Sequence, residues 1–169
     1  MHSNQQNNQH KIGVLFVCLG NICRSPSAQG ILESKIKALG LDDKIIVDSC
    51  GTAPFNVGKK PDQRALAACK HYGYEIENQI ARQISDEDYV NYDYIIPMDR
   101  KNMMSITAWK PKDFKGEIKL MMEYHKNNAG TTQIPDPYHE GAKAFFPIIE
   151  TLEIACDGLL ETIKEQHKL

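Results

Sequence analysis

Residues 12–26 read IGVLFVCLGNICRSP, and this stretch predicts a strand, a short loop and the start of a helix. Ile12–Cys18 is rich in β-branched and aromatic residues and is apolar on both faces, which is typical of a buried strand in a parallel sheet. Ser25 is a favourable N-cap residue, Pro26 fits the first helical position, and apolar residues then recur at helical spacing until Gly40. The helix is expected to cover the sheet.

The alternation of strands and helices continues along the chain. Further elements are expected as strands at Lys44–Asp48, Asp93–Met98 and Glu117–Leu120, and as helices at Pro61–Tyr72, Ser85–Tyr92 and Asp99–Ala108. The segment from Ala142 to Ile163 has the apolar stripe of an amphipathic helix, which places Pro147 in its first turn. This order predicts an α/β fold with a doubly wound sheet, helices on both faces, and ligand sites beyond the C-terminal ends of the strands.

Length and composition indicate one compact domain. The chain has 169 residues, of which 41% are hydrophobic and 25% are charged. We expect a single domain at residues 11–169, preceded by a polar tail at residues 1–10 that is disordered. Folding of a chain of this size buries roughly 70% of the surface of the unfolded chain, so its stability requires no metal and no disulfide framework.

Charge and cysteine content exclude several classes of protein. The 20 basic and 22 acidic residues give a net charge of −2, which argues against a surface for nucleic acid or anionic membranes. The longest apolar run, Ile12–Leu19, is far shorter than the about 20 residues of a membrane span. Five cysteines favour a reducing compartment over a disulfide scaffold, and residues 1–10 lack the basic start of a secretory signal. We expect a cytoplasmic protein without a metal or cofactor.

The loop between the first strand and the first helix predicts an anion site. Backbone N–H groups of a loop at a helix N-terminus point inward, and the helix dipole adds positive charge there. Gly20 and Asn21 can adopt the positive φ values that such a nest requires. Cys18 would then be held as a thiolate, Arg24 would hold two oxygens of a tetrahedral anion, and Ser25 would donate to the sulfur. The alternative is a buried strand cysteine and a surface arginine.

A proton donor for phosphoester cleavage is predicted late in the chain. Residues 134–138 read IPDPY, and the two prolines that flank Asp136 restrict its loop. A Pro-Asp-Pro segment alone usually forms only a turn. In combination with the cysteine loop, Asp136 becomes the candidate general acid.

These segments resemble the low-molecular-weight protein tyrosine phosphatases. The resemblance is carried by Val17–Pro26, VCLGNICRSP, and by Asp136–Tyr138, DPY, and shorter matches extend it over about residues 11–166. It implies a four-stranded parallel sheet of the phosphotyrosine protein phosphatase I type and a two-step hydrolysis of phosphotyrosine without a metal. Protein substrates that carry phosphotyrosine are the implied partners, and the implied state is a monomer or a weak homodimer.

The resemblance also implies roles for individual residues. Cys18 attacks phosphorus, Arg24 clamps the phosphate, and Asp136 protonates the phenolic oxygen and later acts as a base. The phosphate-binding loop is implied to comprise Leu19, Gly20, Asn21, Ile22, Cys23 and Ser25. Cys23 further resembles a second thiol that pairs with an oxidised Cys18, although a packing thiol beside the loop is the alternative.

The implied pocket wall departs from the common family pattern. Phe55, Tyr138 and His139 occupy the wall positions, with His139 where many members have Tyr and Phe55 where some have Trp. Asn78 stands where some members have His. The chemistry is therefore expected to be that of the family, while the preferred substrate stays open.

Three alternative functions remain to be weighed. Arsenate reductases on this fold use a downstream pair of closely spaced cysteines, and cysteines 50, 69 and 156 form no such pair. Phosphoarginine phosphatases of the family typically have Thr at the position of Ile22, whose apolar side chain favours a phenolic leaving group. An inactive phosphate-binding module would usually lack Cys18 or Asp136, and both are present.

Overall fold

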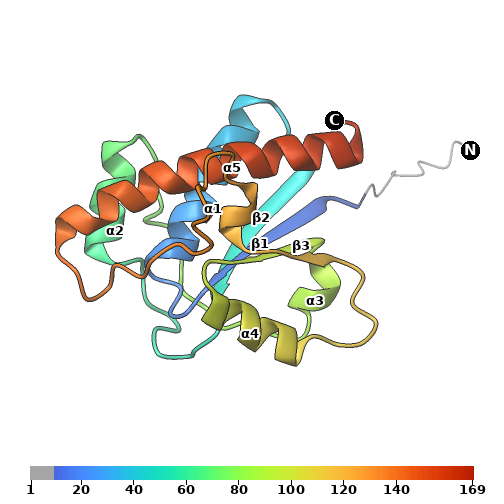
Figure 1. Ribbon diagram of the computed structural model, residues 1–169, viewed down its shortest axis with the longest axis horizontal. Coiled ribbons are helices and arrows are strands. Elements are labelled where there is room, and N and C mark those ends of the chain that lie inside the picture. The colour runs from blue at the N-terminus through green and yellow to red at the C-terminus, as the bar shows by residue number, and fades with distance from the viewer. Residues whose placement is uncertain (1–9) are drawn as a thin grey trace, which may run out of the picture.

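A four-stranded parallel sheet forms the centre of the protein, which is represented by a computed structural model that describes residues 10–169 (Figure 1). The strands are β1 (Ile12–Cys18), β2 (Ile45–Gly51), β3 (Tyr94–Pro97) and β4 (Glu117–Ile118), in the order β2-β1-β3-β4. All three neighbouring pairs run parallel. The predicted fold class is confirmed, whereas the tail predicted at residues 1–10 lies, except for His10, outside the described residues.

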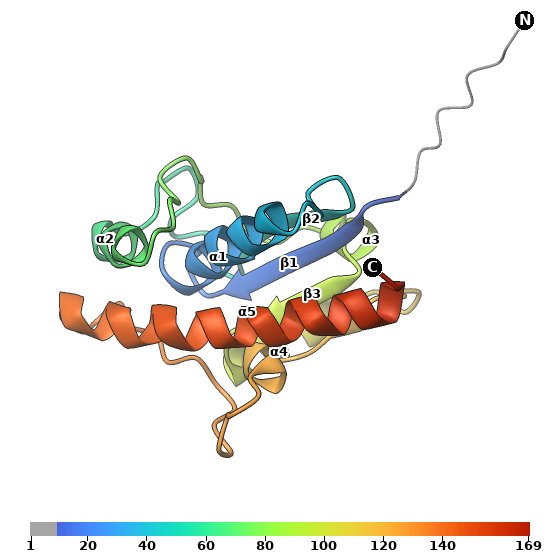
Figure 2. The ribbon, with the colours of Figure 1, turned by 90° about the horizontal axis from the view of Figure 1, so that it is seen from above.

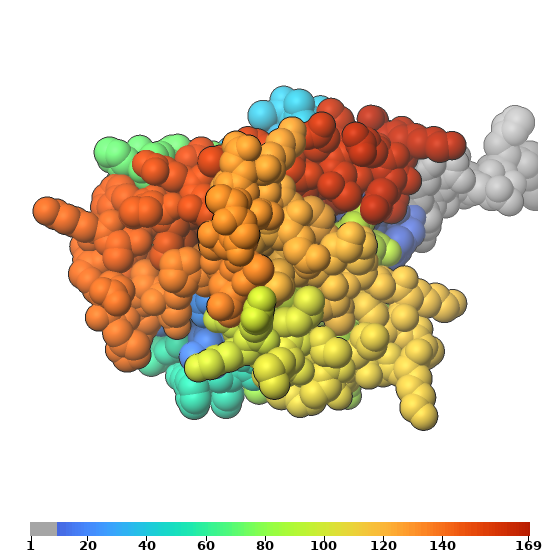
Figure 3. Space-filling model, viewed as in Figure 1, coloured from blue at the N-terminus to red at the C-terminus, as the bar shows by residue number. Residues whose placement is uncertain are grey.

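Helices cover both faces of this sheet. They are α1 (Arg24–Ala38), α2 (Gln63–His71), α3 (Asp88–Asn91), α4 (Arg100–Trp109) and α5 (Phe145–His167), with 3-10 turns η1 (Met121–Tyr124) and η2 (Ala142–Ala144). The long helix α5 runs beside α1 and extends along the length of the molecule (Figure 2). In the space-filling view, α5 and the segment before it, coloured orange to red, cover much of the visible face (Figure 3).

Strand β1 is buried on both sides, which explains its continuous apolar sequence. Its side chains alternate between two cores, because successive side chains of a strand point to opposite faces. Val14 and Phe16 belong to the larger core beneath α1 and α5, whereas Leu15 and Val17 belong to a smaller core that contains Tyr89 of α3 and Ile106 of α4. The sequence therefore predicted β1 with its observed bounds.

The starts of the first two helices differ from the prediction. The N-cap of α1 is Cys23 and not Ser25, which lies in the first turn of the helix with its hydroxyl 2.9 Å from the sulfur of Cys18. The N-cap of α2 is Asp62, whose carboxylate accepts a hydrogen bond from the backbone N–H of Arg64. The prediction that Pro61 begins α2 was therefore wrong.

Other elements were placed correctly but with different bounds. Strand β2 continues beyond the predicted Asp48 to Gly51, because Gly51 still pairs with Cys18. Helix α3 is shorter than predicted, since the backbone N–H of Ser85 donates to the Asp88 carboxylate and the residues before Asp88 form a turn. The predicted cap of α4 is confirmed: Asp99 forms a capping box.

The C-terminal helix begins later than predicted but has the predicted geometry. Residues 142–144 form η2, and α5 begins at Phe145, so Pro147 lies in its first turn. Gly158 in α5 costs about 1 kcal/mol relative to Ala in an ordinary helix. A Cβ at Gly158 would lie 1.8 Å from the carbonyl oxygen of Tyr124, so the close packing of η1 on α5 requires glycine there.

The topology places the site at the end of β1. The chain passes from β1 through α1 to β2 on one side, and later enters β3 on the other side of β1. Loops that leave a sheet in opposite directions open a crevice at the C-terminal ends of the strands. Cys18, the last residue of β1, lies at this crevice. Within residues 10–169, no helix is long and apolar enough to cross a membrane.

The Asp62 cap generates a prediction for stability. We expect Asp62→Ala to destabilise the protein by about 1 kcal/mol at neutral pH, because the first turn of α2 loses its cap. Hydrogen bonds from Arg64 lower the pKa of Asp62 below its ordinary 3.8, so the carboxylate favours the folded state. Its contribution is complete above the unfolded pKa and is lost as the pH falls through the lower folded pKa.

Urea unfolding of the wild type and the variant between pH 2 and pH 7 measures this contribution. The two stability curves should converge at the acidic end. Asp113→Ala, which changes an exposed aspartate, is the matched control and should follow the wild type throughout. A constant difference between the wild type and Asp62→Ala at all pH values would contradict the assignment.

Candidate active site

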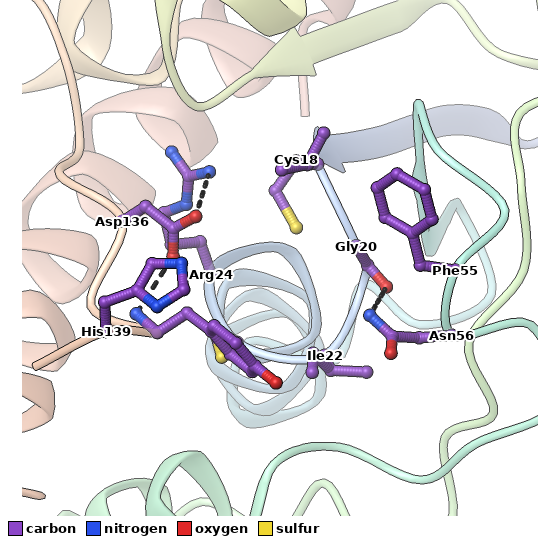
Figure 4. A pocket seen from close by; sticks show the side chains of 11 residues that line it. Cys18, Gly20, Ile22, Arg24, Phe55, Asn56, Asp136 and His139 are labelled. Atoms are coloured by element: carbon purple, nitrogen blue, oxygen red, sulfur yellow. Dashed lines mark hydrogen bonds and ion pairs between the residues drawn. The ribbon is translucent and has the colours of Figure 1, made fainter.

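A pocket of about 260 Å³ lies at the C-terminal end of β1 and joins the two segments singled out in the sequence. It is lined by Cys18, Leu19, Gly20, Ile22, Cys23, Arg24, Phe55, Asn56, Asp136, Tyr138 and His139. Figure 4 shows Phe55 and Asp136 at opposite sides of the pocket, with Cys18 between them (Figure 4). Every predicted residue except Asn21 and Ser25 lines the pocket, and these two lie buried behind it.

Two polar groups of the loop and of α1 contact the sulfur of Cys18. It lies 2.9 Å from the Ser25 hydroxyl and accepts a hydrogen bond of 3.3 Å from the backbone N–H of Asn21. Helix α1 begins at Arg24, so the positive end of its dipole lies at the same loop. Donors and a helix N-terminus stabilise negative charge, which is the electrostatic environment that a nucleophilic thiolate requires.

The loop backbone turns at Asn21, as predicted, but not at Gly20. Asn21 has a φ of 56°, in the left-handed region, whereas Gly20 is absent from the residues with positive φ. Glycine at position 20 instead lets the side chain of Asn56 approach, since a Cβ there would lie 2.6 Å from its nitrogen and would push that side chain aside. That nitrogen donates a hydrogen bond of 3.3 Å to the carbonyl oxygen of Gly20. Asn56 is thus a pocket residue that the sequence analysis missed.

The side chain of Asn21 holds this turn in place. Its Nδ2 donates to the hydroxyl oxygens of Ser25 at 2.8 Å and Ser49 at 3.0 Å. Its Oδ1 accepts from the backbone N–H of Arg82 at 3.0 Å. Three hydrogen bonds therefore fix one buried side chain between α1, β2 and the segment before α3.

Arg24 is buried and points into the pocket, so the interpretation as a surface arginine was wrong. Only 2% of its side chain is exposed. Its Nη1 donates to Asp99 Oδ2 at 2.7 Å and to the carbonyl oxygen of Ile134 at 3.0 Å, and its Nη2 lies 3.6 Å from Asp136 Oδ2. One edge of the guanidinium is thus held by protein, and the other faces the pocket.

Asp99 is a second residue that the sequence analysis missed, because it was assigned only as a helix cap. It both caps α4 and holds Arg24. The position of Asp99 offered a signal, since it follows β3 at the same sheet edge at which Cys18 ends β1. An acid at that edge lies within reach of the buried arginine.

The loop that carries Asp136 is fastened to α2 as well as restricted by its prolines. Asp136 is 39% exposed, and its Oδ1 accepts from the backbone N–H of Tyr138. Arg64 donates to the carbonyl oxygens of Tyr138 at 2.9 Å and Glu140 at 2.6 Å. Asp62 in turn fixes the guanidinium of Arg64 through both of its carboxylate oxygens. This clamp holds Asp136 beside Arg24.

Cys23 remains a thiol in this environment. Burial, followed by the nearby Asp62 carboxylate, raises the pKa of Cys23 far above its ordinary range. All five cysteines are unpaired and buried, and burial also raises the pKa of Cys69 to about 11. Both interpretations of Cys23, as a redox partner of Cys18 or as a packing thiol, stay predictions.

Aromatic side chains form the exposed rim of the pocket. Phe55 is 73% exposed and Tyr138 is 47% exposed. The rings of Tyr138 and His139 meet edge to face at 5.0 Å, and the guanidinium of Arg64 lies 5.6 Å from the centre of the Tyr138 ring. The rim therefore offers flat apolar surfaces beside the buried Cys18 and Arg24. Among residues 10–169, no cluster of His, Cys, Asp and Glu side chains has the arrangement of a metal site.

Comparison with known proteins identifies a family and a set of relatives. A family model described as low molecular weight phosphotyrosine protein phosphatase matches residues 13–169. The low molecular weight phosphotyrosine protein phosphatase of Schizosaccharomyces pombe is 40% identical over 136 residues, which cover 79% of this chain and 85% of the relative.

Two solved structures show the same fold. A protein tyrosine phosphatase from Entamoeba histolytica has a TM-score of 0.86 and 38% identity, and the match covers 94% of this chain and 100% of that one. An arginine phosphatase from Drosophila has a TM-score of 0.82 and 32% identity, with coverage of 89% and 97%.

The environment of the five cysteines predicts selective alkylation. At pH 6.5 we expect iodoacetate to label Cys18 alone, because donors stabilise its anion while burial keeps Cys23 and Cys69 protonated. Peptide mass spectrometry locates the label, and inorganic phosphate should slow the reaction by filling the pocket. Cys18→Ser is the control and should take up no label. Labelling that begins only above about pH 8, like that of free cysteine, would refute the prediction.

Proposed function

The chain belongs to the low molecular weight phosphotyrosine protein phosphatase family, and from this premise we propose that it hydrolyses phosphotyrosine in proteins through a cysteinyl-phosphate intermediate. The observation that carries the proposal is the convergence of three groups on one pocket. Cys18 supplies a sulfur with two hydrogen-bond donors, Arg24 a buried cation, and Asp136 a carboxyl group 3.6 Å from that cation. A nucleophile, an anion clamp and a proton donor are what phosphoester cleavage needs.

In the first step, the Cys18 thiolate attacks phosphorus and the bond from phosphorus to the phenolic oxygen breaks. Asp136 gives its proton to the leaving oxygen, so that tyrosine departs neutral. Arg24 and the loop N–H groups hold the three equatorial oxygens, where charge gathers in the transition state. The Cys18–phosphate bond is the product of this step.

In the second step, water attacks the phosphorus of the intermediate and the sulfur–phosphorus bond breaks. Asp136, now a carboxylate, accepts a proton from the attacking water. The sulfur leaves as a thiolate, and the Ser25 hydroxyl at 2.9 Å donates a hydrogen bond to it. Phosphate is released and the site returns to its starting state.

The walls of the pocket are suited to a flat aromatic substrate. Phe55 and Tyr138 stand at the rim, above the floor formed by Cys18 and Arg24, so a phenyl ring lies between aromatic surfaces when its phosphate reaches the floor. Ile22 lines the pocket and gives it an apolar wall. This wall favours a phenolic leaving group over a guanidinium group, which needs hydrogen-bond acceptors.

Two substitutions test the roles of Cys18 and Asp136. Cys18→Ser should abolish hydrolysis of p-nitrophenyl phosphate because the nucleophile is lost, whereas Asp136→Ala should lower kcat by about 10² to 10⁴, as expected for a missing general acid. Steady-state kinetics at pH 6 measure both effects. Asp113→Ala is the control for a lost surface carboxylate and should retain full activity. Normal turnover by Asp136→Ala would disprove the assignment of the acid.

A panel of substrates tests the proposed specificity. We expect turnover of phosphotyrosine peptides and little turnover of phosphoarginine. Phosphoserine peptides should also be turned over little, because their short side chain does not span the rim. Ile22→Thr, which replaces the apolar wall by a hydroxyl, should raise activity on phosphoarginine relative to phosphotyrosine. Activity should persist in EDTA and be blocked by vanadate. A preference of the wild type for phosphoarginine, or loss of activity in EDTA, would contradict the proposal.

A further inference from the structure

We propose that Gln29 and Gln79 are positioning residues for Cys18, because they set the direction of the hydrogen bonds in a chain that ends at its sulfur. The chain runs from the surface of α1 through Ser49 and Asn21 to the loop. Neither glutamine lines the pocket, and the mechanism above uses neither. Only the turnover measurement below rests on the proposed function, whereas the alkylation measurement does not.

The orientation of Gln29 is fixed by Glu33. The amide nitrogen of Gln29 donates to Glu33 Oε1 at 2.6 Å, and a carboxylate can only accept. The amide oxygen of Gln29 is thereby turned towards Ser49 and accepts a hydrogen bond of 2.7 Å from its hydroxyl. An amide with its ends exchanged would lose both hydrogen bonds.

The orientation of Gln79 is fixed independently, from another part of the chain. Its amide nitrogen donates to the carbonyl oxygen of Pro26 at 2.9 Å, which leaves its amide oxygen 3.5 Å from the same Ser49 hydroxyl. Two amide oxygens therefore face one hydroxyl group. An amide oxygen cannot donate, so the single proton of Ser49 points towards the glutamines.

The hydrogen-bond direction set at Ser49 determines the direction of each following hydrogen bond up to the sulfur of Cys18. With its proton engaged, Ser49 can only accept from the Nδ2 of Asn21. The Oδ1 of Asn21 accepts from Arg82, so its second Nδ2 proton goes to the oxygen of Ser25. Ser25 then has its own proton free to donate, and of the two acceptors within reach the Cys18 sulfur, at 2.9 Å, is closer than the Cys50 carbonyl oxygen, at 3.4 Å. A donor at this position stabilises the thiolate, both for attack and for departure.

Without the two glutamine oxygens, the proton of Ser49 lacks its acceptors. The remaining acceptor within reach is the Oδ1 of Asn21, which becomes available if that amide turns over. A turned amide offers its oxygen to Ser49 and withdraws a donor from Ser25, and it leaves the N–H of Arg82 unpaired. The hydrogen bond from Ser25 to Cys18 is then no longer enforced.

The test removes both acceptors while retaining side-chain volume. We expect the double variant Gln29→Met with Gln79→Met to lower the rate of Cys18 alkylation by iodoacetate at pH 6.5 by about fivefold to tenfold, the effect of one net hydrogen bond. The kcat for p-nitrophenyl phosphate should fall to a similar extent. KM should change by less than about twofold, because Arg24 and the loop N–H groups still bind the phosphate.

A rescue variant distinguishes hydrogen-bond direction from packing and charge. Gln29→Glu with Glu33→Gln, made together with Gln79→Met, exchanges the amide and the carboxylate at constant net charge. The new glutamate still accepts from Ser49, and the new glutamine donates to it. We expect alkylation to recover to within about twofold of the wild-type rate. The negative charge moves closer to the sulfur, so an effect of charge alone would slow the reaction further.

The outcomes separate the possible roles. Gln63→Met, the same substitution at the start of α2, is the matched control and should match the wild type in both rates. The proposal is wrong if the double methionine variant loses only thermal stability, or if the exchanged pair reacts as slowly as the double methionine variant. A wild type without phosphatase activity would overturn the proposed function, while the alkylation rates would still decide the role of the glutamines.

Discussion

Asn21 occupies a left-handed backbone conformation in the loop after β1, and the geometry of the pocket depends on this one residue. A non-glycine residue in that conformation costs roughly 1–2 kcal/mol. Its buried side chain offsets this cost by bonding to Ser25, Ser49 and the backbone of Arg82. The turn brings the N–H of Asn21 to the sulfur of Cys18. The hydrogen bonds behind the loop thus position the N–H group that stabilises negative charge on the Cys18 sulfur.

Charged pairs join the segments of the site that are far apart in the sequence. Arg24 connects the loop to Asp99 at the end of β3, and Arg64 connects α2 to the loop of Asp136. Both arginines have a fixed carboxylate partner, so each guanidinium is oriented before a substrate arrives. Prior orientation matters, because catalysis by electrostatic stabilisation depends on groups that do not have to rearrange during the reaction.

Local patterns predicted β1, the Asp99 cap and the cysteine loop, because each depends on residues that are neighbours in the sequence. The helix starts were less predictable. Ser25 is a residue type that is favoured at N-caps, but it lies inside the first turn of α1, where its hydroxyl contacts the sulfur of Cys18. Gly20 was assigned to a positive φ, although its small size serves the approach of Asn56. Such contacts link distant positions, and no local pattern encodes them. The cytoplasmic location and the oligomeric state stay predictions.

Asp99 has two structural roles, which link local unfolding of α4 to the binding of anions in the pocket. One carboxylate closes the first turn of α4 and orients the cation of the pocket floor. Any fluctuation that unwinds that turn therefore removes the carboxylate partner of the guanidinium and leaves it only the Ile134 carbonyl and Asp136, while the central sheet is still intact. Heating that frays the start of α4 should accordingly lower activity ahead of the global transition, since that helix end and the anion clamp share the Asp99 carboxylate.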